Sequence, residues 1–325
     1  MKGVVRIAAF AAGALVAGAH AQAPALGQTF PWKTVRLVSG VSPGSASDTM
    51  ARVISEKLQS RLGQPVIVEN RIGGGGIVGA ASVAKAEPDG HTISVYTSSL
   101  TMVPFRPNPP FDAARDLAPV AVIATIPNVL IVSPAKGWNT LQDLVAAAKA
   151  RPGQLTYGSA GVGTSTHMGA EKFRYAAGIE VVHVPYKGAP EAVADVLAGR
   201  IDFNFAPAVA VMGPIREGKL RALAVGAAKR ARALPTVPTT VEEGYPGSDY
   251  NFWVGLLVAS KTPRETVERL NDEVNKVMQL ADVRERVERL GAEVLTLSRS
   301  GFETMIQEEF EDNAKLVKAA GIKLE

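Results

Sequence analysis

Between positions 35 and 96, stretches with the apolar pattern of a strand alternate with stretches that have the apolar spacing of a helix, and glycine or proline residues separate them. Short segments rich in apolar and β-branched residues at 35–39, 65–69 and 92–96 are typical of strands. A short helix is expected before the third segment. Between the first two segments, apolar residues recur at helical spacing until Gly63: Met50, Val53, Ile54, Leu58 and Leu62. This alternation of strand and helix predicts an α/β sheet.

The same rhythm starts again after a longer apolar segment at residues 120–132. Pro127 and Asn128 interrupt this segment, and each half has the length of a strand, so we predict two buried strands rather than a membrane helix. Beyond it, the pattern predicts a second sheet with its helices. The predicted elements are a helix at 141–150 behind the cap Thr140, a strand at 155–158, a helix at 166–177, a strand at 181–184, a helix opening at Pro190, a strand at 201–205, a helix ending at Gly218 and a strand at 222–226.

The last third of the chain is richer in charged amphipathic helices, predicted at residues 263–280, 283–290 and 301–320, with a short strand at 293–296. Helices of this kind can cover a sheet that is already built. The chain near residues 251–257 is therefore expected to return to the first sheet. This gives two α/β lobes, with residues 30–128 and 253–325 in lobe 1 and residues 129–252 in lobe 2, and two segments crossing between them.

The first residues have the layout of a cleavable signal peptide. Lys2 and Arg6 precede an apolar run at 7–19, which is shorter than the ~20 residues that span a bilayer. The small-residue pattern that ends at Ala21 predicts cleavage before Gln22, export and a periplasmic location. The sequence contains no cysteine, which excludes a lipid-attachment cysteine and a disulfide framework.

Composition and motifs exclude several other functions. The formal net charge is only +4, and Lys and Arg are scattered among Glu and Asp without interleaved aromatic residues, so we expect no nucleic-acid binding. The two S-x-x-K matches, at Ser82 and Ser133, lack the companion motifs of a hydrolase. His91, His167 and His183 lack metal-ligand spacing. We expect no catalytic residue and no metal site.

Residues 74–79 match the G-x-G-x-x-G pattern between a strand and a helix, which is the context of a dinucleotide site. The next strand ends without the Asp or Glu that would hold a ribose. The interpretation we favour is a glycine turn that adopts positive φ and allows a close backbone approach. No cofactor is expected.

Three loops rich in Gly, Ser and Thr, at residues 42–48, 97–101 and 158–166, each follow a strand and lead into a helix. Each offers backbone N–H groups and hydroxyls at a helix start, where the helix dipole favours an anion. In open α/β sheets ligands bind at the carboxyl ends of strands, so a carboxylate is the expected ligand, although ordinary helix caps would look the same. The loops contain no Arg or Lys, so we expect binding without a salt bridge. The candidate ligand-binding residues in them are Gly44, Ser45, Ala46, Ser47, Asp48, Thr97, Ser98, Ser159, Ala160, Gly161, Gly163, Thr164 and Ser165.

Asp48 has two competing roles in this interpretation. Ser45 and Asp48 have the spacing of a capping box, in which Ser45 caps the helix and Asp48 reaches back to the cap. Alternatively, Asp48 faces the cleft and accepts a hydrogen bond from a hydroxyl or ammonium group of the ligand.

These motifs, taken in order, resemble the Bug family of receptors for tripartite tricarboxylate transporters. The resemblance runs from about residue 30 to the C-terminus and is carried mainly by Pro43-Gly44 with Asp48 and by residues 68–71, 73–79, 157–165, 184–188 and 235–239. It implies a type II periplasmic-binding-protein fold that closes on a small carboxylate. It also implies that this ligand is passed to the large and small membrane subunits of a transporter.

Two positions depart from the family pattern. Gly44-Ser45 stands where the family often has Gly-Gly, and Ala206 stands where it often has an aspartate after a strand. The resemblance implies that Tyr186 and Ala206 also line the site. We therefore expect a monomeric periplasmic receptor without catalytic activity. The rival interpretations are a solute sensor that docks on a signalling partner and a hydrolase.

Overall fold

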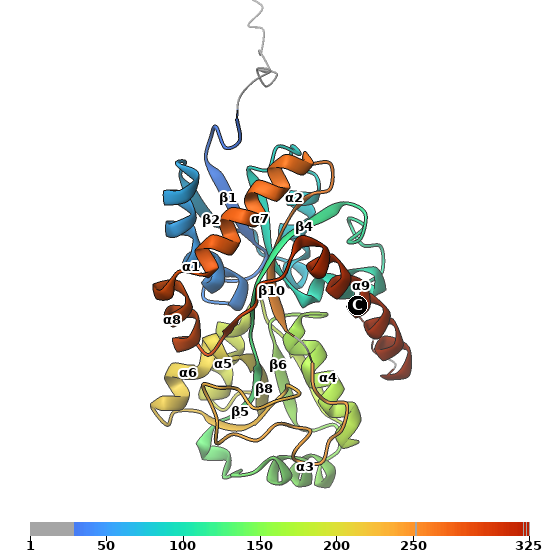
Figure 1. Cartoon of the computed structure of the whole chain (residues 1–325). Helices are drawn as coiled ribbons and strands as arrows, with labels where there is room; N and C mark the ends of the chain where they lie inside the picture. Colours follow the sequence, from blue (N-terminus) through green and yellow to red (C-terminus); the bar gives the residue numbers. More distant parts are fainter. Residues whose placement is uncertain (1–28, 251, 321, 323, 325) are drawn as a thin grey trace, which may run out of the picture.

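The computed structural model describes residues 29–250 and 252–320 together with Ile322 and Leu324. The expected signal peptide at residues 1–21 lies outside this range. Two α/β lobes lie one above the other, each built on its own sheet (Figure 1). Within the described residues, no helix combines the length and the apolar character that crossing a membrane would require.

The first lobe contains a six-stranded sheet in the order β11-β4-β10-β3-β1-β2. Its strands are β1 (Val35–Ser39), β2 (Val66–Asn70), β3 (Thr92–Thr97), β4 (Leu117–Thr125), β10 (Trp253–Ala259) and β11 (Glu293–Val294). Strands β1, β2 and β3 are parallel, and β10 runs antiparallel between β3 and β4. The predicted return of the chain to the first sheet is therefore confirmed.

Helices cover both faces of this sheet. On one face, α1 (Ala46–Leu62) and α7 (Arg264–Met278) share a core with β1 and β3, and on the other face α2 (Ile77–Ala84) and α9 (Arg299–Ala320) do so. Helix α8 (Ala281–Arg289) packs beside α1. Helix α1 ends as predicted at Gly63, whose φ of 68° suits glycine and whose N–H caps the carbonyl of Gln59. One-turn 3₁₀ segments occur at η1 (Gly74–Gly76) and η3 (Pro134–Lys136), and a longer one at η2 (Ser98–Phe105).

The second lobe contains a five-stranded sheet in the order β7-β6-β8-β5-β9. Its strands are β5 (Asn128–Val132), β6 (Thr156–Ser159), β7 (Val182–Pro185), β8 (Phe203–Pro207) and β9 (Arg221–Val225). One face is covered by α3 (Leu141–Ala150) and α4 (Ser165–Ala177), and the other by α5 (Ala189–Leu197) and α6 (Ala208–Arg216). Thr140 and Asp143 form a capping box at α3, which confirms the predicted cap.

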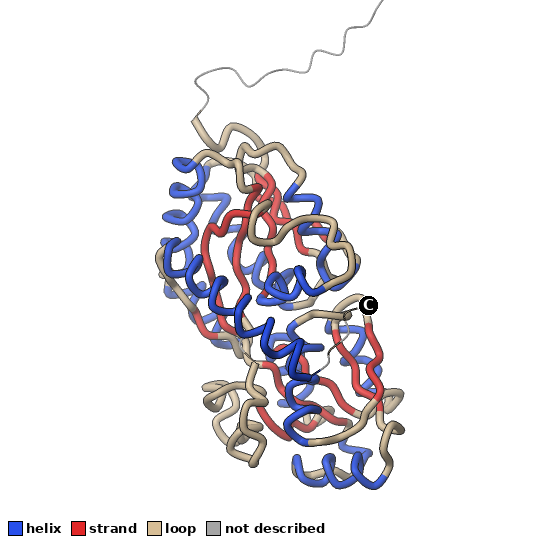
Figure 2. Tube along the Cα trace, turned by 90° about the vertical axis from the view of Figure 1, so that its right-hand side faces the viewer, coloured by secondary structure: helices blue, strands red, loops and turns tan. Residues whose placement is uncertain are grey.

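Two chain segments cross between the lobes side by side. Strand β4 ends at Thr125 and β5 begins at Asn128, so the interruption in the apolar segment is the point at which the chain changes sheet. The second crossing precedes β10, and the N–H of Ile126 donates to the carbonyl of Phe252 at 2.8 Å. Figure 2 shows the lobes along the long axis of the molecule, with the strands of both sheets directed toward the contact between them. The carboxyl ends of parallel strands from both sheets therefore meet in the middle of the molecule.

Candidate ligand-binding site

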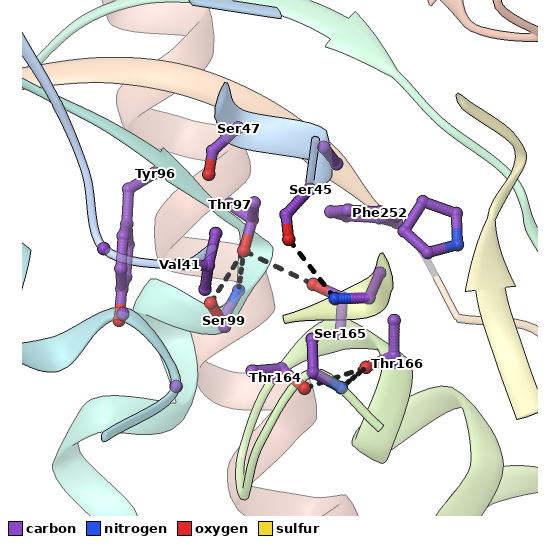
Figure 3. Close-up of a pocket in the computed structure, with 17 residues that line it drawn as sticks. Val41, Ser45, Ser47, Tyr96, Thr97, Ser99, Thr164, Ser165, Thr166 and Phe252 are labelled. Carbon is purple, nitrogen blue, oxygen red and sulfur yellow. Dashed lines mark hydrogen bonds between the residues drawn. The ribbon is translucent and has the colours of Figure 1, made fainter. Parts of the chain in front are cut away.

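A small cavity lies where the two lobes meet, and its walls come from both of them (Figure 3). Residues at the ends of β1, β3, β6 and β8 and at the starts of α1 and α4 line it. The space that the centre of a water molecule can occupy is about 40 Å³. This is room for roughly three or four water molecules, so most metabolites would require the lobes to move apart. No wall residue is charged.

The first-lobe wall includes Ser45, Ala46 and Ser47 at the start of α1. Ser45 occupies the N-cap position without a side-chain capping bond. Its Oγ instead accepts a hydrogen bond at 3.2 Å from the N–H of Ala189 in the second lobe. The predicted capping box at this helix is therefore wrong, because the Ser45 hydroxyl is used between the lobes.

Asp48 lies behind this wall rather than in it. Its buried carboxylate accepts hydrogen bonds from the Gly44 N–H at 2.9 Å, from Arg52 at 3.0 Å and from the Asn70 amide at 2.9 Å. Burial raises the pKa of Asp48, but the bonds from Arg52, Gly44 and Asn70 outweigh it and hold the pKa below its usual value. The carboxylate thus fixes the turn of the first loop by binding Gly44.

The second-lobe wall is the loop at residues 158–166, which is held mainly by its own hydrogen bonds. Thr164 caps α4, and the N–H of Ala160 donates to Oγ1 of Thr166 at 2.9 Å. The N–H of Gly161 donates to Oγ of Ser159 at 3.1 Å. Several N–H groups that the sequence suggested for the ligand are therefore used inside the loop. The donors that remain for a ligand are at the start of α4, where the first N–H groups of a helix have no partner within it.

A stacked histidine pair lies behind this loop. The rings of His167 and His183 are 4.1 Å apart, and Tyr157 stacks on His183 at 4.9 Å. Nδ1 of His167 accepts from the N–H of Gly163 at 3.1 Å, and Nε2 of His183 is hydrogen bonded to Oγ of Ser159 at 2.6 Å. Burial, followed by the neighbouring His183, lowers the pKa of His167 to about 3, and burial lowers that of His183 to about 4. Both rings are therefore neutral at pH 7. Their hydrogen bonds to Gly163 and Ser159 support the loop.

The third histidine is elsewhere, since His91 packs against the rings of Phe30 and Trp32. Across residues 29–250 and 252–320, no group of three His, Asp or Glu side chains has the geometry to hold a metal ion.

The glycine run at residues 73–79 also reaches the cavity. Gly75 and Gly76 line it, and their φ angles are 66° and 104°. A Cβ on Gly75 would lie 2.7 Å from the carbonyl oxygen of Val162 in the other lobe, and one on Gly40 would lie 2.4 Å from the carbonyl oxygen of Gly76. The interpretation of this run as a turn with positive φ and a close backbone approach is confirmed.

Further contacts join the lobes around the cavity. Oγ of Ser98 and Oγ of Ser165 are 2.9 Å apart, and Oγ of Ser42 donates to Glu191 at 2.6 Å. Arg106 donates to the carbonyl oxygen of Val162. The described conformation is therefore a closed one, in which each lobe binds the other.

Some of the sequence-derived candidates line the cavity and others stand behind it. Those that line it are Ser45, Ala46, Ser47, Thr97, Ala160, Thr164 and Ser165. Those outside its walls are Gly44, Asp48, Ser98, Ser159, Gly161, Gly163, Tyr186 and Ala206. The Tyr186 hydroxyl donates to Asp195 at 2.5 Å, and Ala206 is fully buried opposite Val129 in the sheet.

Sequence reasoning did not select ten of the wall residues. They are Gly40, Val41, Gly75, Gly76, Tyr96, Ser99, Thr166, Ala189, Pro207 and Phe252. Ser99 and Thr166 belong to two of the predicted loops, and Tyr96 directly precedes one, so a wider selection would have included them. Ala189, Pro207 and Phe252 carry no local signal, because the fold alone brings them to the cavity.

Two α/β lobes, two crossing segments and an uncharged cavity at the strand ends define a periplasmic binding protein. More narrowly, the chain belongs to the tripartite tricarboxylate transporter family receptors, since residues 50–322 match that family. The predicted family and fold class are thus confirmed.

Three known proteins show how close this relationship is. Protein BugT of Bordetella pertussis is 33% identical over 315 residues, which cover 96% of this chain and 97% of BugT. The structure of Rpa4515 from R. palustris with adipate is 31% identical, with a TM-score of 0.87, and the match covers 91% of this chain and 99% of that one. The structure of MatC from Rhodopseudomonas palustris with bound malate is 30% identical, with a TM-score of 0.83 and coverage of 87% and 98%. These relatives are substrate-binding proteins rather than enzymes, and so is this chain.

Proposed function

We propose that this protein is exported to the periplasm, binds a small carboxylated metabolite between its lobes and delivers it to the large and small membrane subunits of a tripartite transporter. The observation that carries the proposal is the convergence of two helix starts, one from each lobe, on an uncharged cavity. Ala46 and Ser47 begin α1, and Ser165 and Thr166 begin α4. Partly buried helix starts favour an anion by up to ~2 kcal/mol each.

The comparisons support the carboxylate part of this proposal. The relatives described above were solved with adipate and with malate, which both carry two carboxylates. Hydroxyl groups of Thr97, Ser99 and Ser165 stand at the cavity as further donors. Family membership supports the transporter as the partner.

The proposal divides the chain into lobe 1 at residues 30–128 and 253–325 and lobe 2 at residues 129–252. The sheet to which each strand belongs supports this division. Ligand would enter when the lobes rotate apart at the two crossing segments, and binding energy would draw them together.

Carboxylates are expected to raise the melting temperature of the mature protein, and the corresponding amides are not. At a concentration of 100 times Kd, the ligand stabilises the folded state by ~2.7 kcal/mol, which a thermal melt resolves easily. The measurement compares adipate with adipamide and malate with malamide. Equal shifts from acid and amide, or no shift from any carboxylate of a wider panel, would contradict the proposed ligand class.

Export is expected to remove residues 1–21. The positive start, the apolar run and the small residues at Ala19 and Ala21 motivate this expectation. N-terminal sequencing of the protein from a periplasmic fraction should begin at Gln22. Recovery of an uncut chain, or its retention in the cytoplasm, would refute export by this route.

A further inference from the structure

Arg106 reaches across the contact between the lobes. It directly follows η2 in the first lobe, and its guanidinium donates to the carbonyl oxygen of Val162 in the second. A Cβ on Gly163 would lie 2.9 Å from Nη2 of Arg106, so the absence of a side chain at this position makes room for the guanidinium. The arginine thus occupies a space that the glycine-rich loop leaves open.

This cation has no carboxylate partner within ion-pair distance among the described residues. Burial lowers the pKa of Arg106, and the neighbouring Tyr96 phenol opposes this shift. The other partly buried arginines near the site differ, because Arg52 pairs with Asp48 and Arg174 with Glu171. A partly desolvated charge without a counter-ion is unfavourable, so an anion brought to its neighbourhood gains energy.

The guanidinium lies directly behind the cavity wall. The position of a Cβ on Gly75 would be 3.2 Å from Nη2 of Arg106 and 3.0 Å from the methyl group of Thr164, and both Gly75 and Thr164 are wall residues. Since the wall itself is uncharged, a charge one layer away is weakly screened. With an effective dielectric constant of ~20 and a separation of ~6–8 Å, its attraction for a carboxylate corresponds to roughly 30- to 100-fold in affinity.

An unpaired charge of opposite sign stands behind another part of the wall. Glu191 accepts from Ser42 through Oε1, while Oε2 is shielded from solvent and has no hydrogen-bond partner among the residues that the structure describes. A Cβ on Gly188 would lie 3.1 Å from Oε2 and 2.6 Å from Oγ of the wall residue Ser45. Glu191 is therefore a negative counterpart of Arg106 behind the wall, and its hydrogen bond from Ser42 also joins the two lobes.

We propose that Arg106 is a specificity-determining residue, whose positive charge behind the wall favours an ionised carboxylate over a neutral ligand of the same shape. The inference rests on the proposed function, and it adds a charge behind the wall to the helix dipoles and hydrogen bonds that the sequence led us to expect. Arg106 holds the loop at residues 161–163 through its N–H groups and selects the ligand through its charge.

Calorimetric titration with adipate, malate and their diamides tests this on the mature protein and three variants. Arg106→Gln keeps an N–H donor for Val162 but removes the charge, and it should weaken acid binding by ~10- to 100-fold and amide binding by less than ~3-fold. Arg106→Lys keeps the charge and should retain most of the preference for the acid. Glu191→Gln keeps an acceptor for Ser42 and should strengthen acid binding, since it removes a repulsive charge.

The outcomes separate this inference from the proposed function. If the unmodified protein binds neither adipate nor malate nor any other carboxylate of the wider panel, the proposed ligand class fails and the inference fails with it. If the unmodified protein prefers the acids and Arg106→Gln keeps the same ratio of acid to amide affinity, only the inference is overturned. Equal losses for acid and amide in both Arg106→Gln and Glu191→Gln would likewise overturn it, because they would show that these residues only fasten the lobes.

Discussion

Replacement of Gly40 by alanine is expected to reduce ligand affinity at least ~100-fold and to lower the free energy of unfolding by ~3 kcal/mol or more. Gly40 follows β1 and lines the cavity. A Cβ there would lie 2.4 Å from the carbonyl oxygen of Gly76 and 2.5 Å from its Cα, and backbone atoms cannot turn away as a side chain would. The loop of residues 40–45 or the glycine turn must therefore move, and both form the wall of the first lobe.

Gly169→Ala is the matched control. Gly169 lies inside α4, and the nearest atom to an added Cβ is 3.5 Å away, which is an ordinary contact. This variant should bind ligand normally and gain up to ~1 kcal/mol of stability from the helix preference of alanine. Thermal melts and calorimetric titrations of the two variants are compared. Normal ligand affinity in Gly40→Ala would mean that the cavity is not the binding site or that the loop adapts without cost.

Acidification from pH 7 to pH 5 is expected to lower the free energy of unfolding by about 3–4 kcal/mol through His167 and His183 together. Each has a folded-state pKa, about 3 and about 4, below the ordinary value of 6.5. The unfolded state therefore binds more protons below pH 6.5, and stability is fully present above this pH and declines as the pH falls. Carboxylates with lowered pKa values, such as Asp48 and Asp202, add to the loss only at lower pH, near their ordinary value of 3.8.

The ligand affinity of the folded protein should stay nearly constant in this window, because a folded-state pKa of about 3 leaves His167 neutral at pH 5. The bond from the N–H of Gly163 to Nδ1 of His167, which helps to hold the loop that lines the cavity, is therefore kept. Denaturant unfolding and titration at pH 7, 6 and 5 are compared with those of a His167→Gln, His183→Gln double variant. This variant is expected to start less stable but to show a flatter dependence on pH. Identical slopes in the two proteins would exclude the histidine pair as the source.

Local patterns predicted most elements well. Helix α3 has the bounds predicted, residues 141–150, because Thr140 and the apolar spacing mark its start and length. Strand β8 was predicted at 201–205 and lies at Phe203–Pro207, since the local sequence does not mark where this strand begins and ends. The shift places Ala206 inside the strand, fully buried, while Pro207 reaches the cavity.

The site was less predictable for a physical reason. Neighbouring residues determine where a helix starts, so the positions of Ser45 and Thr164 before helices α1 and α4 could be predicted from the local sequence. The contact of Arg106 with Val162 joins residues 56 positions apart in different lobes, and no local spacing encodes it. The same holds for Ser45, whose capping role was predicted from its neighbours but whose hydroxyl is taken by Ala189.

The bond between Ile126 and Phe252 ties the two crossing segments together at one point. Two adjacent strands joined in this way should bend as a pair, and under the proposed function the lobes would then open mainly by rotation about this point. Opening would then break the contacts that Arg106 and Glu191 make between the lobes. Under the proposed function, a membrane subunit that touches both lobes would distinguish a loaded receptor from an empty one by the angle between the lobes, without any contact with the ligand.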